Sequence, residues 1–201
     1  MRSKISNGVR IIAEDIGKKY GKHWIFRHLN FEISSGTKTA ITGSNGSGKS
    51  TLLQVISGYL TPSQGKITAS PQSIDEIKVA FSGPYTEVIE EMTLAELLGF
   101  HAKFRTPHLS FEEMAQRSSL PLDKSVSEFS TGMKQRTKLA LAFFYENDLI
   151  LLDEPTSNLD EQGFAWWKKE IQQKTAEAII IASNQRDEIA ECQNSINLKK
   201  T

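Results

Sequence analysis

The chain has 201 residues, which is room for one ordinary domain or for a compact core with one insertion. Its hydrophobic fraction of 38% is normal for a globular protein and argues against a disordered or fibrous one. Twenty-four Lys and Arg balance twenty-four Asp and Glu, so the chain lacks the basic excess of a dedicated nucleic-acid-binding protein.

The sequence contains neither an apolar run of membrane-spanning length nor a second cysteine. No apolar run approaches the roughly 20 residues of a membrane helix, and the first residues contain no apolar stretch of the secretory type. The single cysteine, Cys192, has no partner for an internal disulfide, which suits a reducing compartment. We therefore expect a soluble, cytosolic protein that contacts a membrane through a partner.

The first third of the chain is predicted to form short strands separated by turns. Branched or alternating apolar residues predict strands at 9–16, 24–33 and 38–42. A glycine-rich loop follows at 43–48, and a helical pattern then runs to residue 60, where Thr61-Pro62 stops it. Two more short strands are predicted at 66–69 and 77–81.

The middle of the chain, from about residue 84 to 146, is predicted to be mostly helical. Thr93 with Glu96, and Ser110 with Glu113, each fit the capping box that begins a helix. Apolar runs then predict buried strands at 149–153 and 178–183, with a helix at 161–175 between them and a short helix and a tail after them. Strands that alternate with helices predict an α/β fold with a mostly parallel central sheet and a helical insertion.

The strongest motif lies between the strand at 38–42 and the next helix. It reads Gly43-Ser44-Asn45-Gly46-Ser47-Gly48-Lys49-Ser50, which is the pattern G-x-x-x-x-G-K-[ST]. Glycines let several backbone N–H groups point at one phosphate chain, and the N-terminal end of the helix adds positive potential. Lys49 is suited to the outer phosphates and the Ser50 hydroxyl to Mg²⁺. The alternative is a chance glycine turn, but the strand–loop–helix context favours a nucleoside triphosphate site.

A second motif ends the apolar run at 149–153. Asp153 and Glu154 follow each other there. We expect this strand to lie beside the strand that precedes the glycine-rich loop, which would place Asp153 near the Mg²⁺ shell and Glu154 near an attacking water. A buried strand that ends in acids also occurs for structural reasons alone, but its position downstream of a phosphate loop favours the functional interpretation.

In their order and over nearly the whole chain, these motifs resemble the ATP-binding cassette (ABC) ATPases, the nucleotide-binding subunits of ABC transporters. The Walker A loop corresponds to residues 43–51, Walker B with its glutamate to 149–154, the signature to 129–136 and the D-loop to 157–160. The resemblance implies a single nucleotide-binding domain over residues 1–201. It also implies a P-loop NTPase fold with an N-terminal antiparallel β subdomain and a helical subdomain inserted at about 84–146.

The resemblance also implies roles for particular residues. Lys49, Glu154 and Asn184 would be catalytic, and Ser50 and Asp153 would hold Mg²⁺. The ATP contacts would come from Tyr20, Gly43, Ser44, Asn45, Gly46, Ser47, Gly48, Lys49, Ser50 and Thr51 of one subunit and from Ser130 and Gly132 of the other.

Three of the residues in these motifs have a structural alternative. Ser130 would also serve as an ordinary N-cap, Asp160 as the cap of the following helix, and Tyr20 as a half-packed aromatic in a turn. Since a ring face stacks on any base, Tyr20 does not by itself distinguish ATP from GTP.

The chain departs from the family pattern at three places. Asn184 stands at the position of the switch histidine, and an amide neither carries a positive charge nor relays a proton. Ser82 is the nearest polar residue to the expected Q-loop glutamine and has a shorter reach. Thr131 and Met133 replace a glycine and a glutamine of the signature. We therefore expect slow turnover or dependence on a partner, with nucleotide binding intact.

The leading hypothesis is an ATP-binding and ATP-hydrolysing subunit of an ABC transporter. Two copies, or this chain and a homologous subunit, would close head-to-tail on Mg-ATP and drive a separate transmembrane permease subunit at the inner face of a membrane. The helical insertion would dock on that permease, although its apolar residues also suit its own core. The alternative is a nucleotide-binding regulatory module with weak or no hydrolysis. No nucleic-acid partner is expected, because the net charge is zero and the chain has neither long coiled coils nor tandem cassettes.

Overall fold

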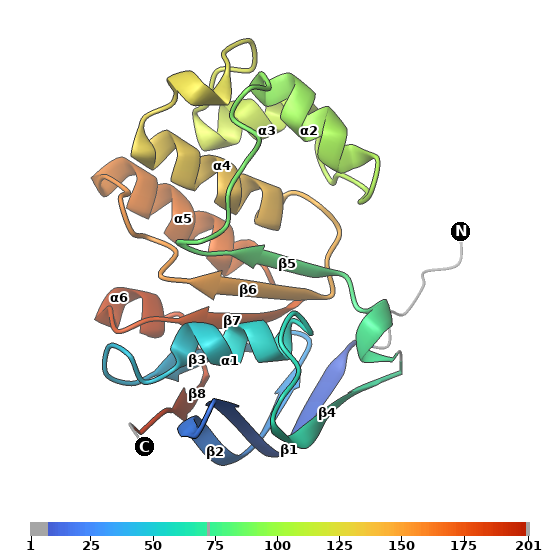
Figure 1. Cartoon of the computed structure of the whole chain (residues 1–201). Helices are drawn as coiled ribbons and strands as arrows, with labels where there is room; N and C mark the ends of the chain where they lie inside the picture. Colours follow the sequence, from blue (N-terminus) through green and yellow to red (C-terminus); the bar gives the residue numbers. More distant parts are fainter. Residues whose placement is uncertain (1–7, 72, 200–201) are drawn as a thin grey trace. The chain divides into compact units, whose positions relative to one another are not determined.

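A computed structural model of the chain describes residues 8–71 and 73–199. The chain divides into two compact units (Figure 1). The first unit takes its described residues from 1–79, 148–153 and 175–201, and the second consists of 80–147 and 154–174. None of the helices in the described ranges is long and apolar enough to cross a membrane.

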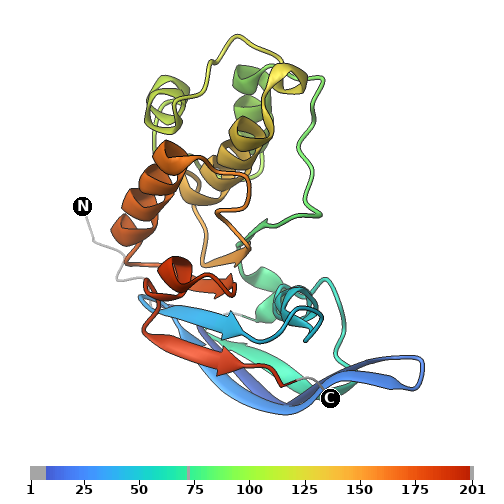
Figure 2. The same cartoon turned by 90° about the vertical axis from the view of Figure 1, so that its left-hand side faces the viewer.

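The first unit contains an antiparallel sheet of three strands, β1 (Arg10–Tyr20), β2 (His23–Ser34) and β4 (Gln64–Ser70), in the order β2-β1-β4 (Figure 2). The hairpin between β1 and β2 pairs Tyr20 with His23. Alternate residues of β1 such as Ile11 and Ala13 are fully or almost fully buried, which is the pattern of a sheet with one covered face. The three strands predicted at 9–16, 24–33 and 66–69 are confirmed, and all three are longer than predicted.

The second sheet has the strand order β5-β6-β7-β3-β8. Its strands are β3 (Lys38–Thr42), β5 (Val79–Ser82), β6 (Leu149–Asp153), β7 (Ala178–Ala182) and β8 (Asn194–Asn197), and β3 pairs in parallel with both β7 and β8. Every residue of β6 and of β7 is buried, as in parallel strands that are covered on both faces. The mostly parallel α/β sheet is confirmed.

The prediction that β6 lies beside β3 is wrong. We expected β6 to lie beside β3, but β7 lies between them, in register with β6 from Leu149↔Ala178 to Asp153↔Ala182. The physical reason is that β7 is as apolar as β6 and is buried on both faces, which a central strand achieves. Asp153 is therefore two strands away from the end of β3, at the same edge of the sheet.

Three local predictions also need correction. Helix α1 (Lys49–Ile56) ends four residues before residue 60, and a turn with Gly58 at a φ of 79° follows it. The short helix α6 (Arg186–Ile189) is present, but the tail after it forms the unpredicted strand β8. The stretch at 84–92, predicted to be part of a mostly helical region, contains no helix.

The second unit contains four α-helices, α2 (Leu94–Ala102), α3 (Phe111–Ser118), α4 (Thr131–Phe143) and α5 (Glu161–Gln173), with a short 3₁₀ turn η2 (Val126–Glu128). Both predicted capping boxes are confirmed: Thr93 accepts a hydrogen bond from the N–H of Glu96, and Ser110 from that of Glu113. All four helices contribute fully or almost fully buried apolar side chains, namely Leu94, Leu97, Leu98, Met114, Leu139, Phe143, Trp167 and Ile171.

Candidate functional site

The loop between β3 and α1 has the backbone shape that its sequence predicts. Gly43, Gly46 and Gly48 have φ values of 149°, 79° and 97°. A Cβ on Gly43 would lie 2.5 Å from the carbonyl oxygen of Leu198, and one on Gly48 would overlap the side chain of Ile25. A Cβ on Gly46 would meet nothing within 4 Å, so the loop is open on that side. The glycines thus allow a curled backbone that a phosphate chain can approach closely.

The start of α1 has no side-chain cap. Its N-cap residue is Gly48, no side chain caps it, and its first turn contains no acidic residue. The Ser47 side chain is buried, with 1% of the residue exposed, and its Oγ has no hydrogen-bond partner among the described residues. Lys49 is also buried, and its Nζ donates to the carbonyl oxygen of Gly43 at 3.0 Å. An uncapped helix end, an unpartnered buried hydroxyl and a held cation together fit a phosphate group.

The remaining predicted residues of this loop lie around these groups. Ser44 and Asn45 are exposed, and Ser50 and Thr51 lie half-buried in the first turn of α1. Asp153 is the buried last residue of β6. Hydroxyl and carboxylate oxygens such as those of Ser50 and Asp153 are the hard ligands that Mg²⁺ prefers.

Asn184, at the switch position after β7, contacts the same loop. Its Nδ2 donates to Oδ1 of Asn45 at 3.1 Å, across 139 positions of the chain. Ser183 before it is fully buried, and the N–H of Gln185 after it donates to the Ser183 Oγ at 2.9 Å. The turn that follows β7 is thus fixed locally, and it presents Asn184 to the phosphate loop.

Tyr20 lies at the tip of the β1–β2 hairpin. It is 51% exposed, and the Lys18 Nζ lies 5.5 Å from the centre of its ring. Further along β2, Ile25 and Phe26 lie close to Gly48. One strand of the hairpin therefore contacts the phosphate loop, while the ring of Tyr20 keeps an accessible surface.

The second unit brings the signature and D-loop residues together. Ser130 is the N-cap of α4, where its Oγ accepts a hydrogen bond from the N–H of Met133 at 3.2 Å. A Cβ on Gly132 would lie 2.9 Å from the carbonyl oxygen of Asn158, and the buried Gln135 donates from Nε2 to the carbonyl oxygen of Pro155 at 2.8 Å. Gly132 thus permits the close approach of the first turn of α4 and the D-loop, which are more than 20 residues apart in the chain.

Asp160 is confirmed as a helix cap. It is the N-cap of α5, and its Oδ1 accepts a hydrogen bond from the N–H of Gly163 at 2.7 Å. This structural role fixes the end of the D-loop.

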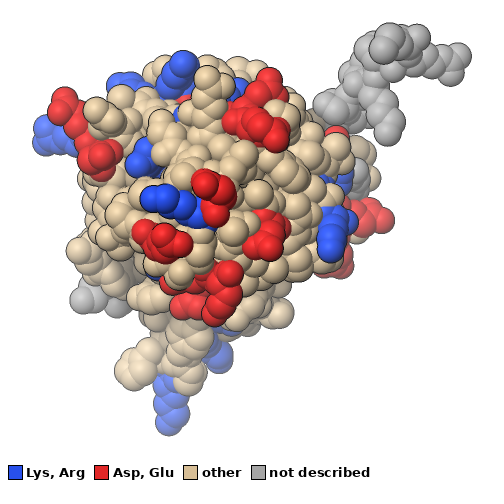
Figure 3. Space-filling view, turned by 90° about the horizontal axis from the view of Figure 1, so that it is seen from above, with Lys and Arg blue, Asp and Glu red and all other residues tan. Residues whose placement is uncertain are grey.

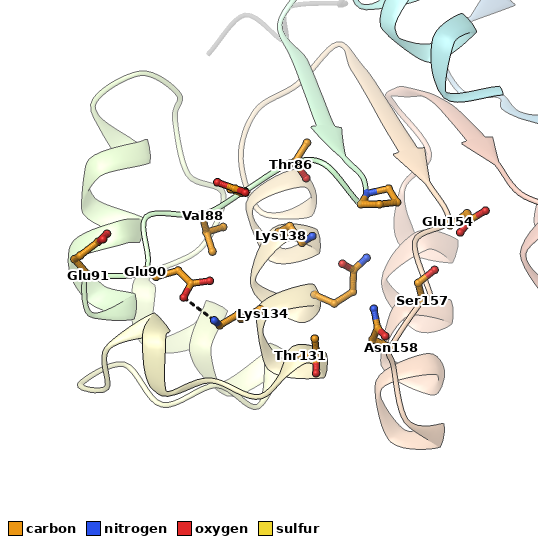
Figure 4. A pocket seen from close by; sticks show the side chains of 13 residues that line it. Thr86, Val88, Glu90, Glu91, Thr131, Lys134, Lys138, Glu154, Ser157 and Asn158 are labelled. Carbon is orange, nitrogen blue, oxygen red and sulfur yellow. Dashed lines mark ion pairs between the residues drawn. The ribbon is translucent and has the colours of Figure 1, made fainter. Parts of the chain in front are cut away.

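Glu154 has an unusual backbone. Its φ is 48°, in the left-handed region that costs a non-glycine residue about 1–2 kcal/mol. Its side chain is exposed and, with Thr131, Ser157 and Asn158, lines a cavity of about 570 Å³ in the second unit (Figure 4). Strain of this kind persists where the surrounding structure imposes it, and it is common at functional sites.

Ser82 does not present its side chain to solvent. It is fully buried at the end of β5, and its Oγ has no hydrogen-bond partner within residues 8–71 and 73–199. The next residues form a closed turn, because the Thr86 Oγ1 donates to the carbonyl oxygen of Gly83 and accepts from its N–H. A serine in this position therefore has no free reach toward a ligand.

The sequence analysis missed two lysines that line the cavity beside Glu154. Lys134 and Lys138 lie on α4 together with Thr131 and Gln135 (Figure 4). Their spacing of four residues on a predicted helix places them on one face, and this is the signal that could have identified them.

Known proteins resemble this chain over most of its length. The model of the family described as "ABC transporter" matches residues 26–157. An ABC transporter ATP-binding protein of Bacillus subtilis (strain 168), itself uncharacterized, is 32% identical, with 87% of this chain and 85% of that protein covered. The chain belongs to the ABC transporter family.

Other ABC proteins resemble it over different shares of their length. The sulfate/thiosulfate import ATP-binding protein of Mesostigma viride is 30% identical over 92% of this chain, but this chain covers only 58% of that protein. Among solved structures, an ABC transporter ATP-binding protein from Pyrococcus furiosus has a TM-score of 0.83 at 24% identity, with 96% of this chain and 100% of that chain covered. A dimeric ATP-binding cassette bound to ADP and Pi has a TM-score of 0.80 at 20% identity, with 94% of both chains covered. At these identities the structures establish the ABC fold.

Proposed function

We propose that this ABC protein binds and hydrolyses ATP as the nucleotide-binding subunit of a transporter. The observation that carries the proposal is the loop at 43–48, which combines three glycines of positive φ, the uncapped end of α1 and a buried Ser47 hydroxyl that has no hydrogen-bond partner among the described residues. Backbone N–H groups and the ammonium of Lys49 would hold the phosphates, and Tyr20 would stack on the base. Ser44, Asn45, Gly46 and Thr51 complete the set of contacts through the loop and the first turn of α1.

Mg²⁺ would be held by Ser50 and Asp153. When bound, the ion neutralises charge on the phosphate oxygens. Glu154 would accept a proton from a water whose oxygen attacks the γ-phosphorus. The bond between the γ-phosphorus and the oxygen that bridges it to the β-phosphate would break, and ADP would leave with that oxygen. Asn184 would orient that water or the γ-phosphate by hydrogen bonding.

The active form would be a head-to-tail dimer, either of two copies or of this chain with a homologous subunit. Ser130 and the N–H groups around Gly132 would then contact the ATP held by the opposite subunit. This arrangement is supported by the exposed loop at the start of α4 and by the dimeric ADP-bound cassette of the same fold.

Closure of the dimer would act on a separate transmembrane permease subunit, with the protein placed in the cytoplasm on the inner face of the membrane. The curated names of relatives, such as "sulfate/thiosulfate import ATP-binding protein", support a transport role. We propose no nucleic-acid partner, because the formal net charge of the chain is zero, and the face seen in Figure 3 carries scattered acidic and basic side chains without a continuous basic area.

The test is the rate of ATP hydrolysis by the purified protein, alone and in membranes that contain its permease. The proposal predicts a low rate alone and a clear increase with the permease. Nucleotide binding without hydrolysis under either condition would contradict it.

Nucleotide binding without hydrolysis is instead expected of the second candidate, a nucleotide-binding regulatory module. Two observations favour it: Ser82 is fully buried at the Q-loop position, and a neutral amide, Asn184, replaces the switch histidine. Such a module would still close on ATP but would be reset by dissociation rather than by hydrolysis.

A further inference from the structure

Two lysines of α4 hold the segment that follows β5, residues 83–91, against the helix. The Lys134 Nζ forms an ion pair with Oε2 of Glu90 at 2.7 Å. One helical turn later, the Lys138 Nζ donates to the carbonyl oxygen of Gly83 at 3.2 Å. Figure 4 shows both lysines on α4, with the side chain of Lys134 directed toward Glu90. The segment is thus attached to the helix near both of its ends.

The contact between Lys138 and Gly83 is less exposed to water than the ion pair between Lys134 and Glu90. Lys138 is half-buried, and this burial lowers the pKa of its ammonium, while the neighbouring Glu87 raises it. The carbonyl oxygen of Gly83 also accepts the Thr86 hydroxyl at 2.8 Å, so Lys138 binds a turn that is already closed. The ion pair of Lys134 is more open to water, with 26% and 47% of the two side chains exposed, and such pairs contribute little.

The far end of the segment is attached to a different element. The N–H of Ser127 donates to the carbonyl oxygen of Glu90 at 2.9 Å, and that of Val126 to the carbonyl oxygen of Met92. Between the two ends, Thr86 and Val88 line the cavity of about 570 Å³ that also reaches Glu154. The middle of the segment therefore borders a space, and its position depends on its attached ends.

Helix α4 is also the element that begins at Ser130 and Gly132. Lys138 lies eight residues after Ser130, about two turns along the same helix, so a rigid α4 would carry a displacement of its first turn to Lys138. On its outer side the 83–91 segment carries Tyr85, which is 86% exposed, and Ile89, which is 38% exposed.

We propose that Lys138 is a positioning residue that makes the 83–91 segment follow α4 when nucleotide binds, with Lys134 as a second, weaker contact. Because Ser82 is buried and offers no reach to a ligand, the lysine supplies a link that the residue at the Q-loop position does not. The inference rests on the proposed function, since it assumes that ATP engages the start of α4. Its consequence is that nucleotide state is passed through Lys138 to the exposed Tyr85 and Ile89.

The test is hydrogen exchange of the full-length protein in a Glu154→Gln background, with and without Mg-ATP. Lys138→Met keeps most of the side-chain volume and removes the cation, Lys138→Arg keeps a cation, and Lys103→Met is a matched control on an exposed lysine of the same unit. Without nucleotide, we expect amides at 83–89 to exchange about tenfold faster in Lys138→Met, the effect of one lost charged hydrogen bond. In Lys138→Arg and in Lys103→Met, the amides at 83–89 should exchange at the same rate as in the parent protein.

With Mg-ATP, amides at 130–135 should slow in all four proteins. Amides at 83–89 should slow in the parent, in Lys138→Arg and in Lys103→Met, but not in Lys138→Met. A normal response of 83–89 in Lys138→Met would overturn the inference and leave the proposed function standing. No response at 130–135 in the parent would instead contradict the proposed function, and the coupling with it.

Discussion

The side-chain amide of Asn184 donates a 3.1 Å hydrogen bond to the Oδ1 of Asn45, which joins the end of β7 to the phosphate loop. The residue at the switch position is therefore held at the loop by a neutral contact. This bond uses one N–H of the Asn184 amide, whose oxygen is a hydrogen-bond acceptor. This geometry suits orientation of a water or a phosphate and provides no group that relays a proton.

We predict that Asn184→His raises the steady-state rate of ATP hydrolysis, because an imidazole near its ordinary pKa can relay a proton and an amide cannot. Steady-state kinetics at neutral pH measures this directly. Asn45→Ala serves as the companion variant, since it removes the acceptor and should lower the rate of the wild-type Asn184 enzyme. An unchanged rate in Asn184→His would show that the contact with Asn45 already compensates for the missing histidine.

Glu154→Gln should slow hydrolysis by roughly 10²- to 10⁴-fold, the usual effect of losing a general base, and leave ATP affinity intact. Glu154→Gly separates chemistry from backbone strain. Since Glu154 has a φ of 48°, glycine should raise the free energy of unfolding while also abolishing hydrolysis. An equal loss of binding and hydrolysis in Glu154→Gln would count against the assigned role.

Stability should depend on pH through His101. Burial, and to a smaller extent the charge of Arg105, lower the pKa of His101 below its usual 6.5 in the folded protein. The unfolded chain therefore binds a proton here at a higher pH than the native state does, so the free energy of unfolding falls as pH drops below about 6.5. Urea titrations between pH 7.5 and 5 should show this slope, and it should be smaller in His101→Gln. The same slope in both proteins would refute the assignment.

The ion pair between Arg117 and Glu170 should matter for stability. Glu170 is 3% exposed, and its two carboxylate oxygens accept from Nε and Nη2 of Arg117, the first at 3.2 Å. Removing one partner of a buried pair costs about 3–5 kcal/mol, and we expect the lower end for Arg117→Met because Arg117 is partly exposed. The exposed pair of Arg10 and Glu32 is the control, and Arg10→Met should change little. Similar unfolding midpoints for the two variants would contradict this ranking.

Local patterns made much of the fold predictable. Runs of buried apolar residues marked β6 and β7, and Ser or Thr followed three residues later by Glu marked the starts of α2 and α3. The phosphate loop was equally visible, because its glycines are required by local backbone geometry.

The parts that sequence reasoning missed depend on distant partners. The polar strand β8 has no apolar alternation and exists through its pairing with β3. Likewise, the order of β3, β7 and β6 is decided by burial of whole strands. The contact between Asn184 and Asn45, and that between Lys138 and Gly83, join residues 139 and 55 positions apart, which no local pattern encodes.

The most direct test of the account is calorimetric titration of the protein with Mg-ATP, in wild type and in Lys49→Ala, with Lys103→Ala as a control. Because Lys49 is the buried cation of the phosphate loop, its loss should weaken binding by roughly 10- to 100-fold, the equivalent of a charge-assisted hydrogen bond, while the control binds like wild type. Absence of binding by the wild type, or equal affinity in Lys49→Ala, would contradict the claim that this loop holds the triphosphate.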